Sequence, residues 1–301
     1  MVKVVRDQAE GLRRLLAKRP LRIVALLSAS QGSGASTAAV NLAAALCHHG
    51  KRALVIDEHD EHVPAIRGHR GQDAHTGKLP FRATLADLVE GRMTLEGAFS
   101  GQDGNQTVTV LDAPLGMSIA ATTEEQIAVF DGEADLVLID ACMDASGSLS
   151  PLAAMANDIV VVMDADAASL TSAYGLIKRL HLVNASQQFR LLFNRVAHPA
   201  DAQGVYTNLS GVAMRYLGIS LTPAGVISRD RDRITRAATL GSSVVSAFPA
   251  APAAIDYRRI AADMLNWPWR PISNRQANSG LARPSFETSP IAHFGEAAQT
   301  V

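Results

Sequence analysis

Glycine and hydroxyl residues gather in one short run, SQGSGAST at 30–37, whose composition suits a phosphate-binding turn. In such a turn, backbone N–H groups surround phosphate oxygens, a lysine spans the β- and γ-phosphates, and a Ser or Thr hydroxyl holds Mg²⁺. The candidate nucleotide-binding residues of the run are Gly32, Ser33, Gly34, Ser36 and Thr37. Ala35 stands where the lysine is expected. The run therefore predicts a phosphate-binding turn that lacks the positively charged lysine.

The segments on both sides of this loop predict the elements that hold it. LRIVALLSA (21–29) is a continuous apolar run, which is typical of a strand buried on both faces. AAVNLAAALCHHG (38–50) predicts a helix ended by Gly50, and RALVID (52–57) predicts a second strand. Strand, glycine-rich loop, helix and strand in this order form the context that a phosphate-binding loop requires.

The rest of the chain alternates between strand and helix patterns. Strands are expected at 107–111, 135–140, 158–164 and 190–194, and helices at 83–98, 122–130, 150–156, 169–183, 205–217, 230–241 and 254–267. This alternation predicts an α/β fold with a mostly parallel, doubly wound sheet. We expect an N-terminal segment at 1–20 with a short helix at 7–18, the α/β domain at 21–270 and a disordered tail at 271–301, where periodicity is lost.

The bulk composition restricts the partners and the location. The chain has 301 residues and a net charge of −1, which implies no global attraction to nucleic acid or membrane. Without an apolar run of 18 residues or a secretory signal, it is expected to be cytoplasmic. Cys47 and Cys142 have no metal-binding spacing and predict reduced thiols. Four histidines lie in a predicted loop at 58–80, with spacings that fit no standard metal site, namely His59, His62, His69 and His75.

The run from Ser30 to Asp57 resembles the deviant Walker A unit of the MinD/ParA family, K-G-G-x-G-K-[ST]-T followed by a VNLA-type helix and a strand ending in Asp. The resemblance implies a P-loop NTPase-like fold that binds ATP or ADP with Mg²⁺. The family's cross-dimer lysine falls on Ser30, and its Walker lysine falls on Ala35. The resemblance also implies Mg²⁺ ligands, which are Ser36, Asp57 and Asp140.

Three further motifs resemble the FlhG (FleN) branch of that family. ASLTSAYGLIKRL (168–180) is similar to a helix of the branch, and Asn194 and Arg195 match its base-contacting "NRV" strand end. An N-terminal DQA-type motif matches at Asp7, Gln8, Ala9, Leu12 and Arg13. This resemblance implies partner binding by that motif to an FlhF-like GTPase, contacts with flagellar basal-body or regulatory proteins, a homodimer, and a peripheral position at the cell pole or inner membrane.

The departures from the family pattern concern catalysis. Ala35 replaces the lysine, and His59 replaces a second carboxylate after Asp57, so the catalytic set is expected to be vestigial. The leading hypothesis is a degenerate or inactive ATPase, a pseudo-ATPase, that regulates flagellar number or placement through protein contacts. The alternatives are an active MinD/ParA-type ATPase switch, and a DNA-partition or cellulose-synthesis accessory member. No specific nucleic-acid partner is expected, because a basic surface or an appended helix-turn-helix is missing.

The helical pattern at 254–267 has two interpretations. Its apolar residues, Tyr257, Ile260, Met264 and Trp267, share one face. They either pack on the core or contact a membrane surface, and the core interpretation is favoured because only Arg258 and Arg259 are basic.

Overall fold

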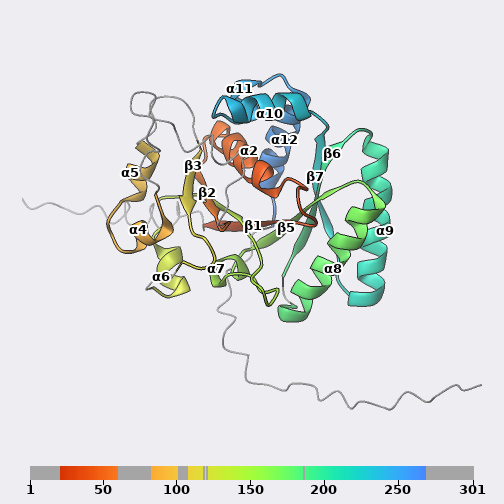
Figure 1. Cartoon of the computed structure of the whole chain (residues 1–301), viewed down its shortest axis with the longest axis horizontal. Helices are drawn as coiled ribbons and strands as arrows, with labels where there is room; N and C mark the ends of the chain where they lie inside the picture. Colours follow the sequence, from red (N-terminus) through yellow and green to blue (C-terminus); the bar gives the residue numbers. More distant parts are fainter. Residues whose placement is uncertain are drawn as a thin grey trace, which may run out of the picture. The chain divides into compact units, whose positions relative to one another are not determined.

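The computed structural model describes residues 21–59, 83–100, 108–117, 119, 121–185 and 187–268. Over these residues the chain forms a seven-stranded sheet in the order β3-β2-β4-β1-β5-β6-β7 (Figure 1). Every neighbouring pair in it is parallel. The strands are β1 (Arg22–Ser28), β2 (Ala53–Asp57), β3 (Thr109–Asp112), β4 (Leu136–Asp140), β5 (Asp158–Asp164), β6 (Phe189–Val196) and β7 (Thr222–Ser228). The predicted mostly parallel, doubly wound α/β fold is confirmed.

Helices cover both faces of this sheet. In Figure 1, α2 and α12 lie on one face together with α10 and α11, and α8 and α9 lie on the other. The helices of the described chain are α2 (Ala35–His48), α4 (Leu85–Val89), α5 (Leu95–Ser100), α6 (Thr123–Ala128), α7 (Pro151–Ala154), α8 (Ala167–Val183), α9 (Pro199–Leu217), α10 (Arg231–Thr239), α11 (Val244–Ala247) and α12 (Pro252–Met264). Among them, none is long and apolar enough to cross a bilayer.

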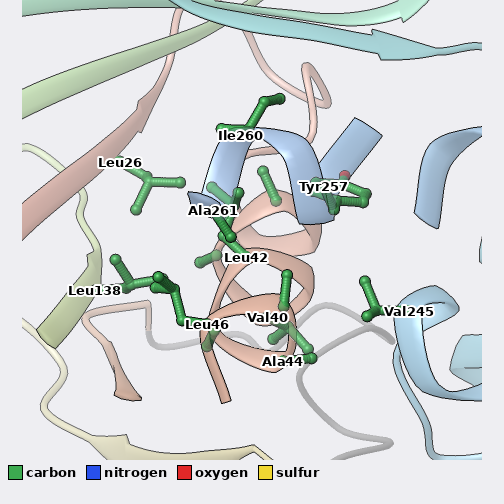
Figure 2. Packing of buried hydrophobic residues seen from close by; sticks show 14 of the residues in the cluster. Leu26, Val40, Leu42, Ala44, Leu46, Leu138, Val245, Tyr257, Ile260 and Ala261 are labelled. Carbon is green, nitrogen blue, oxygen red and sulfur yellow. The ribbon is translucent and has the colours of Figure 1, made fainter. Parts of the chain in front are cut away.

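The helix that follows the glycine-rich loop is buried between the sheet and α12. Figure 2 shows Leu46 of α2 beside Leu138 of β4, with Ile260 and Ala261 of α12 packed over the same helix. Gly225 of β7 makes this packing possible, because a Cβ there would lie 2.5 Å from Cγ1 of Ile260. Helix α2 is therefore held between β4 and α12, which lie far from it in the sequence.

The packing of α12 supports the core interpretation of its apolar face. Tyr257, Ile260 and Met264 are at most 1% exposed, and they pack against α2 and β7. That face is consequently covered by protein and is not available to a membrane surface. The guanidinium of Arg190 lies 3.9 Å from the ring centroid of Trp267, the fourth residue of the predicted face.

Several boundaries differ from the expected ones. The helix expected at 38 begins at Ala35, because Gly34 takes a left-handed conformation (φ 97°) and the loop passes directly into the helix. The helix expected at 205 begins at Pro199, where a proline is well suited to the first helical position. The element expected at 83–98 divides into α4 and α5 at Gly91 (φ 71°).

Two elements were not expected from the sequence at all. Strand β7 has the sequence TPAGVIS, whose Pro223 and Gly225 argue against a strand. It forms at the edge of the sheet, where a proline leaves only an outer hydrogen bond unmade. Helix α11 is a single turn capped by Ser243, whose hydroxyl accepts a hydrogen bond from the Ser246 N–H. The segments 1–20 and 271–301 lie outside the described residues.

Candidate functional site

The candidate site lies at the carboxyl ends of the central strands. Parallel strands bring their carboxyl ends to one edge of a sheet, which is where ligands bind in folds of this type. The glycine-rich loop follows β1, and Asp57 and Asp140 end β2 and β4, where they are register partners. Burial raises the pKa of Asp140, and the Ser36 hydroxyl in the first turn of α2 opposes part of that rise. The structure thus brings the predicted Mg²⁺ ligands Ser36, Asp57 and Asp140 together.

The backbone of the loop has the form that a phosphate cradle needs. Gly32 (φ 79°) and Gly34 (φ 97°) are both left-handed, and the first N–H groups of α2 have no carbonyl within their own helix to bond. The positive end of the helix dipole adds to this attraction for an anion. Ala35 is 3% exposed, and its methyl group packs in the core. The run 30–37 contains no lysine. The loop therefore has the backbone conformation of a phosphate-binding turn but lacks the positive charge of the lysine.

Asn194 and Arg195, which the resemblance places at the base, contact the loop itself. Asn194 Nδ2 donates to the Ser33 carbonyl at 2.8 Å, and Arg195 Nη1 donates to the Gly32 carbonyl at 2.9 Å. Arg195 also pairs with Asp164, where its Nε lies 2.9 Å from Oδ1, and this pairing raises the pKa of Arg195. Arg195 therefore holds a positive charge against the loop, supplied by β6 instead of position 35.

His59 lies against both buried carboxylates. Its Nδ1 is 3.3 Å from Oδ1 of Asp57 and 3.4 Å from Oδ2 of Asp140. Both aspartates are fully buried, whereas the His59 side chain is 36% exposed. Contacts with Asp140 and then Asp57 raise the pKa of His59 to about 10, against the opposing effect of its burial. Burial raises the pKa of Asp140, and His59 opposes that rise. In the absence of another cation, we conclude that the imidazole is protonated and neutralises the acidic pair.

This arrangement does not fit Mg²⁺ as it stands. Mg²⁺ requires near-octahedral oxygen ligands at about 2.0–2.1 Å, which the two carboxylates and the Ser36 hydroxyl would supply. His59 Nδ1 lies 3.3 and 3.4 Å from oxygens of the same two carboxylates. A nitrogen donor is a poor ligand for Mg²⁺, and a protonated imidazole repels any cation. No catalytic step through Mg²⁺ follows from these residues.

Glu58 is a further residue of the site, which sequence reasoning missed. It is 3% exposed, accepts a hydrogen bond from the Ser150 hydroxyl and accepts another from the Cys142 N–H at 3.3 Å. Burial raises the pKa of Glu58 to about 7. It contributes to the wall of a cavity of about 420 Å³, whose other walls include Leu115 and Met117. The only sequence signal was an acidic residue directly after a buried strand.

Of the remaining predicted residues, the structure describes Thr37 but not the partner-binding residues. Thr37 lies in the first turn of α2, where its carbonyl accepts a hydrogen bond from Nδ2 of Asn41 at 2.8 Å. The predicted partner-binding residues lie outside the described part of the chain, and these are Asp7, Gln8, Ala9, Leu12 and Arg13. His62, His69 and His75 also lie outside it.

Comparison with curated proteins finds relatives that match most of this chain. No family model matches the chain. It is 26% identical over 263 residues to the antiactivator FleN of Pseudomonas aeruginosa, covering 85% of this chain and 91% of that protein. It is 29% identical to the chromosome-partitioning ATPase Soj of Thermus thermophilus, covering 83% and 98%.

Solved structures share the fold of this chain. The septum site-determining protein MinD of Pyrococcus horikoshii, complexed with Mg-ADP, matches with a TM-score of 0.58 and 22% identity, covering 81% of this chain and 96% of that one. The MinD of the Aquifex aeolicus MinC:MinD complex matches with a TM-score of 0.59 and 15% identity, covering 91% and 100%. These structures show the shared fold.

Proposed function

Because the chain belongs to the MinD/ParA superfamily and is FleN-like within it, we propose that it is an FlhG-like regulator of flagellar biosynthesis that works through protein contacts. Its partners are an FlhF-like GTPase and flagellar basal-body or regulatory proteins. In this proposal it is a pseudo-ATPase, and nucleotide bound at the loop is held weakly. A homodimer and a peripheral position at the cell pole or inner membrane belong to the same proposal.

The observation that carries the pseudo-ATPase proposal is the buried methyl group of Ala35 at the head of α2. A hydrogen bond to a charged partner contributes about 1.5–3 kcal/mol, so the missing lysine weakens nucleotide binding about 10- to 100-fold. The loss for catalysis is greater, because phosphoryl transfer depends on neutralising charge that develops on the transferred group. His59 adds to this loss, since it stands against the acidic pair that would hold the metal ion.

Calorimetric titration with ATP and Mg²⁺, run beside a phosphate-release assay, tests this proposal. We expect no turnover, and binding that strengthens about 10- to 100-fold when the lysine is restored in Ala35→Lys. A far-UV circular dichroism melt confirms that the variant is folded. Turnover of ATP by the wild-type chain would refute the pseudo-ATPase proposal, and unchanged affinity in Ala35→Lys would contradict the role given to the missing lysine.

The partner proposal has its own test. A variant with Gln8, Leu12 and Arg13 replaced by alanine is expected to lose binding to an FlhF-type GTPase in a pull-down and in a titration. The matched control is Arg179→Ala, which removes an exposed arginine of α8 far along the sequence from that segment. If the triple variant binds as the control does, the contact lies elsewhere on the chain.

One observation favours a second function, a nucleotide-dependent switch. Arg195 places a guanidinium on the carbonyl of Gly32 and is the cation that the described residues bring to the loop. It could balance phosphate charge in place of the lysine if it left Asp164. In that case Arg195→Gln would abolish nucleotide binding in the titration above, whereas the pseudo-ATPase proposal expects little change.

A further inference from the structure

The spacing within the acid–histidine cluster is unusual for a hydrogen-bonded ion pair. A charge-assisted N–H···O bond is normally about 2.7–2.9 Å long. In the cluster of Asp57, His59 and Asp140, the nitrogen lies 3.3 and 3.4 Å from the two carboxylate oxygens. A tetrahedral cation with bonds of about 2.0–2.1 Å to nitrogen and oxygen holds its ligand atoms about 3.3 Å apart. The two distances from Nδ1 therefore match the spacing of ligand atoms around such a cation, and all three donor atoms lie within 4.8 Å of one another.

Asp140 supplies a second, independent observation. It is fully buried, and neither of its carboxylate oxygens accepts a hydrogen bond of good geometry from the described residues. The Ser36 hydroxyl and the His59 ring face it, but without that geometry. A buried carboxylate without hydrogen bonds is costly, and the cost is usually met by a bound cation or a well-placed donor. Asp140 is thus oriented toward a ligand that side chains alone do not provide.

The donor set selects the kind of cation. One imidazole nitrogen and two carboxylate oxygens suit Zn²⁺ and neighbouring transition metals, whereas Mg²⁺ prefers oxygen ligands alone. We propose that Asp57, His59 and Asp140 form a binding site for a divalent transition-metal ion of the zinc type, where a nucleotide site would hold Mg²⁺. The fourth position falls to the Ser36 hydroxyl or to water, and the Nδ1 proton leaves to solvent when the ion binds.

Such an ion would act as a structural tie. Asp57 ends β2, Asp140 ends β4, and Ser36 begins the helix after the loop, so one ion joins three segments that meet at this edge of the sheet. The loop would then be held by a metal ion and would not depend on bound nucleotide. This inference goes beyond the regulatory function, because it holds whatever partner the chain has.

Cobalt provides the test, since Co²⁺ replaces Zn²⁺ and absorbs visible light when it is bound in a tetrahedral site. The full-length, untagged chain is stripped with a chelator and titrated with Co²⁺. We expect a visible spectrum that saturates at one ion per chain, that one equivalent of Zn²⁺ abolishes, and that millimolar Mg²⁺ leaves unchanged. Absence of a saturable spectrum would overturn the proposal.

Three variants identify the ligands. His59→Ala is expected to abolish the spectrum, and His59→Asp, which creates an oxygen-only set, to weaken Zn²⁺ binding at least tenfold and strengthen Mg²⁺ binding. The matched control replaces His62, His69 and His75 together with alanine, and this variant keeps the spectrum. If His59→Ala keeps the spectrum, or if the control loses it, the ion binds in the histidine-rich segment and the proposed site is wrong.

Circular dichroism separates loss of ligand from loss of fold. The apo forms of wild type, His59→Ala and His59→Asp are compared before any metal is added, and only folded variants are scored. Added Zn²⁺ is expected to raise the melting temperature of the wild type and of the triple-histidine control, but not that of His59→Ala. Equal stabilisation of His59→Ala would also contradict the proposal. None of these readouts depends on ATP or on a flagellar partner, so their failure leaves the regulatory proposal standing.

Discussion

The glycine-rich loop and the acid–histidine cluster are neighbours, yet they depart from a working nucleotide site in opposite ways. The loop keeps its backbone, with Gly32 and Gly34 in left-handed conformations, and loses a side chain at Ala35. The cluster keeps its buried acids and gains a side chain, His59, that changes which ions they can bind. Backbone geometry is set by packing of α2 against the sheet and α12, so it persists when the chemistry of individual side chains is altered.

The largest expected effect is a loss of stability on substitution in the glycine-rich loop. A Cβ on Gly34 would lie 2.4 Å from Nδ2 of Asn194, and φ is 97°, so Gly34→Ala combines backbone strain with a collision. We expect it to lower the free energy of unfolding by about 3 kcal/mol. At Gly32 (φ 79°) a Cβ meets open space, so Gly32→Ala is expected to cost about 1 kcal/mol. Urea denaturation measures both, and equal losses would show that the Asn194 contact is unimportant.

In the acid–histidine cluster, removal of His59 is expected to lower the stability of the protein. His59→Ala leaves two buried carboxylates without their cation, and we expect a loss of about 1–2 kcal/mol, less than for a fully buried pair because His59 is partly solvent-screened. Metal-free protein unfolded in urea measures this loss. Combining it with Asp140→Asn, which removes one of the stranded charges, should recover part of the loss. A double variant that is no more stable than His59→Ala would contradict this account of the pair.

The pH dependence of stability tests whether His59 is protonated in the folded protein. Since the folded-state pKa of His59 is raised to about 10 from an ordinary value of 6.5, its contribution is complete below pH 6.5 and is lost as pH rises toward 10. Metal-free protein should therefore become less stable across that range, and His59→Ala should show a flatter profile. Thermal melts between pH 6 and 10 make the comparison, and parallel profiles would rule out the assigned protonation.

The titration of Glu58 is expected to change the stability by less than that of His59, and over a lower pH range. Its pKa is raised to about 7, so the folded chain holds a proton that the unfolded chain releases near pH 4.5, and stability falls as pH rises from 4.5 through 7. Glu58→Gln retains an acceptor for the Ser150 hydroxyl and should remove this slope. Melts at pH 5 and pH 8 measure the effect, with Glu133→Gln on the exposed surface as the matched control. A slope that remains in Glu58→Gln would assign it to another group.

The smallest expected effect concerns the arginine that touches the loop. Arg195→Ala removes a partly exposed pair with Asp164, and such pairs contribute about 0.5–1 kcal/mol. Urea denaturation of the variant against wild type checks the value. A loss above about 2 kcal/mol would mean that Arg195 fixes the loop more strongly than its exposure indicates.

Much of the fold could be predicted because the central strands carry their signal locally. The apolar runs that form β1, β2, β4 and β5 are continuous, and each is read from its own residues. Strand β7 was missed since its proline and glycine are tolerated only because of its edge position and the side chain of Ile260. That information lies outside the seven residues of the strand.

The site was less predictable for the same reason. His59 was recognised as a lost carboxylate, but its approach to Asp140 depends on the pairing of β2 with β4, which are far apart in sequence. The burial of Glu58 depends on Ser150 and Cys142, and the contact of Arg195 with the loop spans 163 residues. Residue types identify candidate groups, whereas only the assembled sheet decides which of them meet.

The packing of α12 on α2 also has a consequence for the order of events during synthesis. The loop and α2 precede every strand of the sheet except β1, but the face of α2 that points away from the sheet is covered by α12, which ends at Met264. A nascent chain emerges from the ribosome N-terminus first, so α2 is synthesised before the strands β2 to β7 and before the helix that covers it. Helix α2 and the loop before it therefore reach their final packing only after the strands β2 to β7 and α12 have been synthesised.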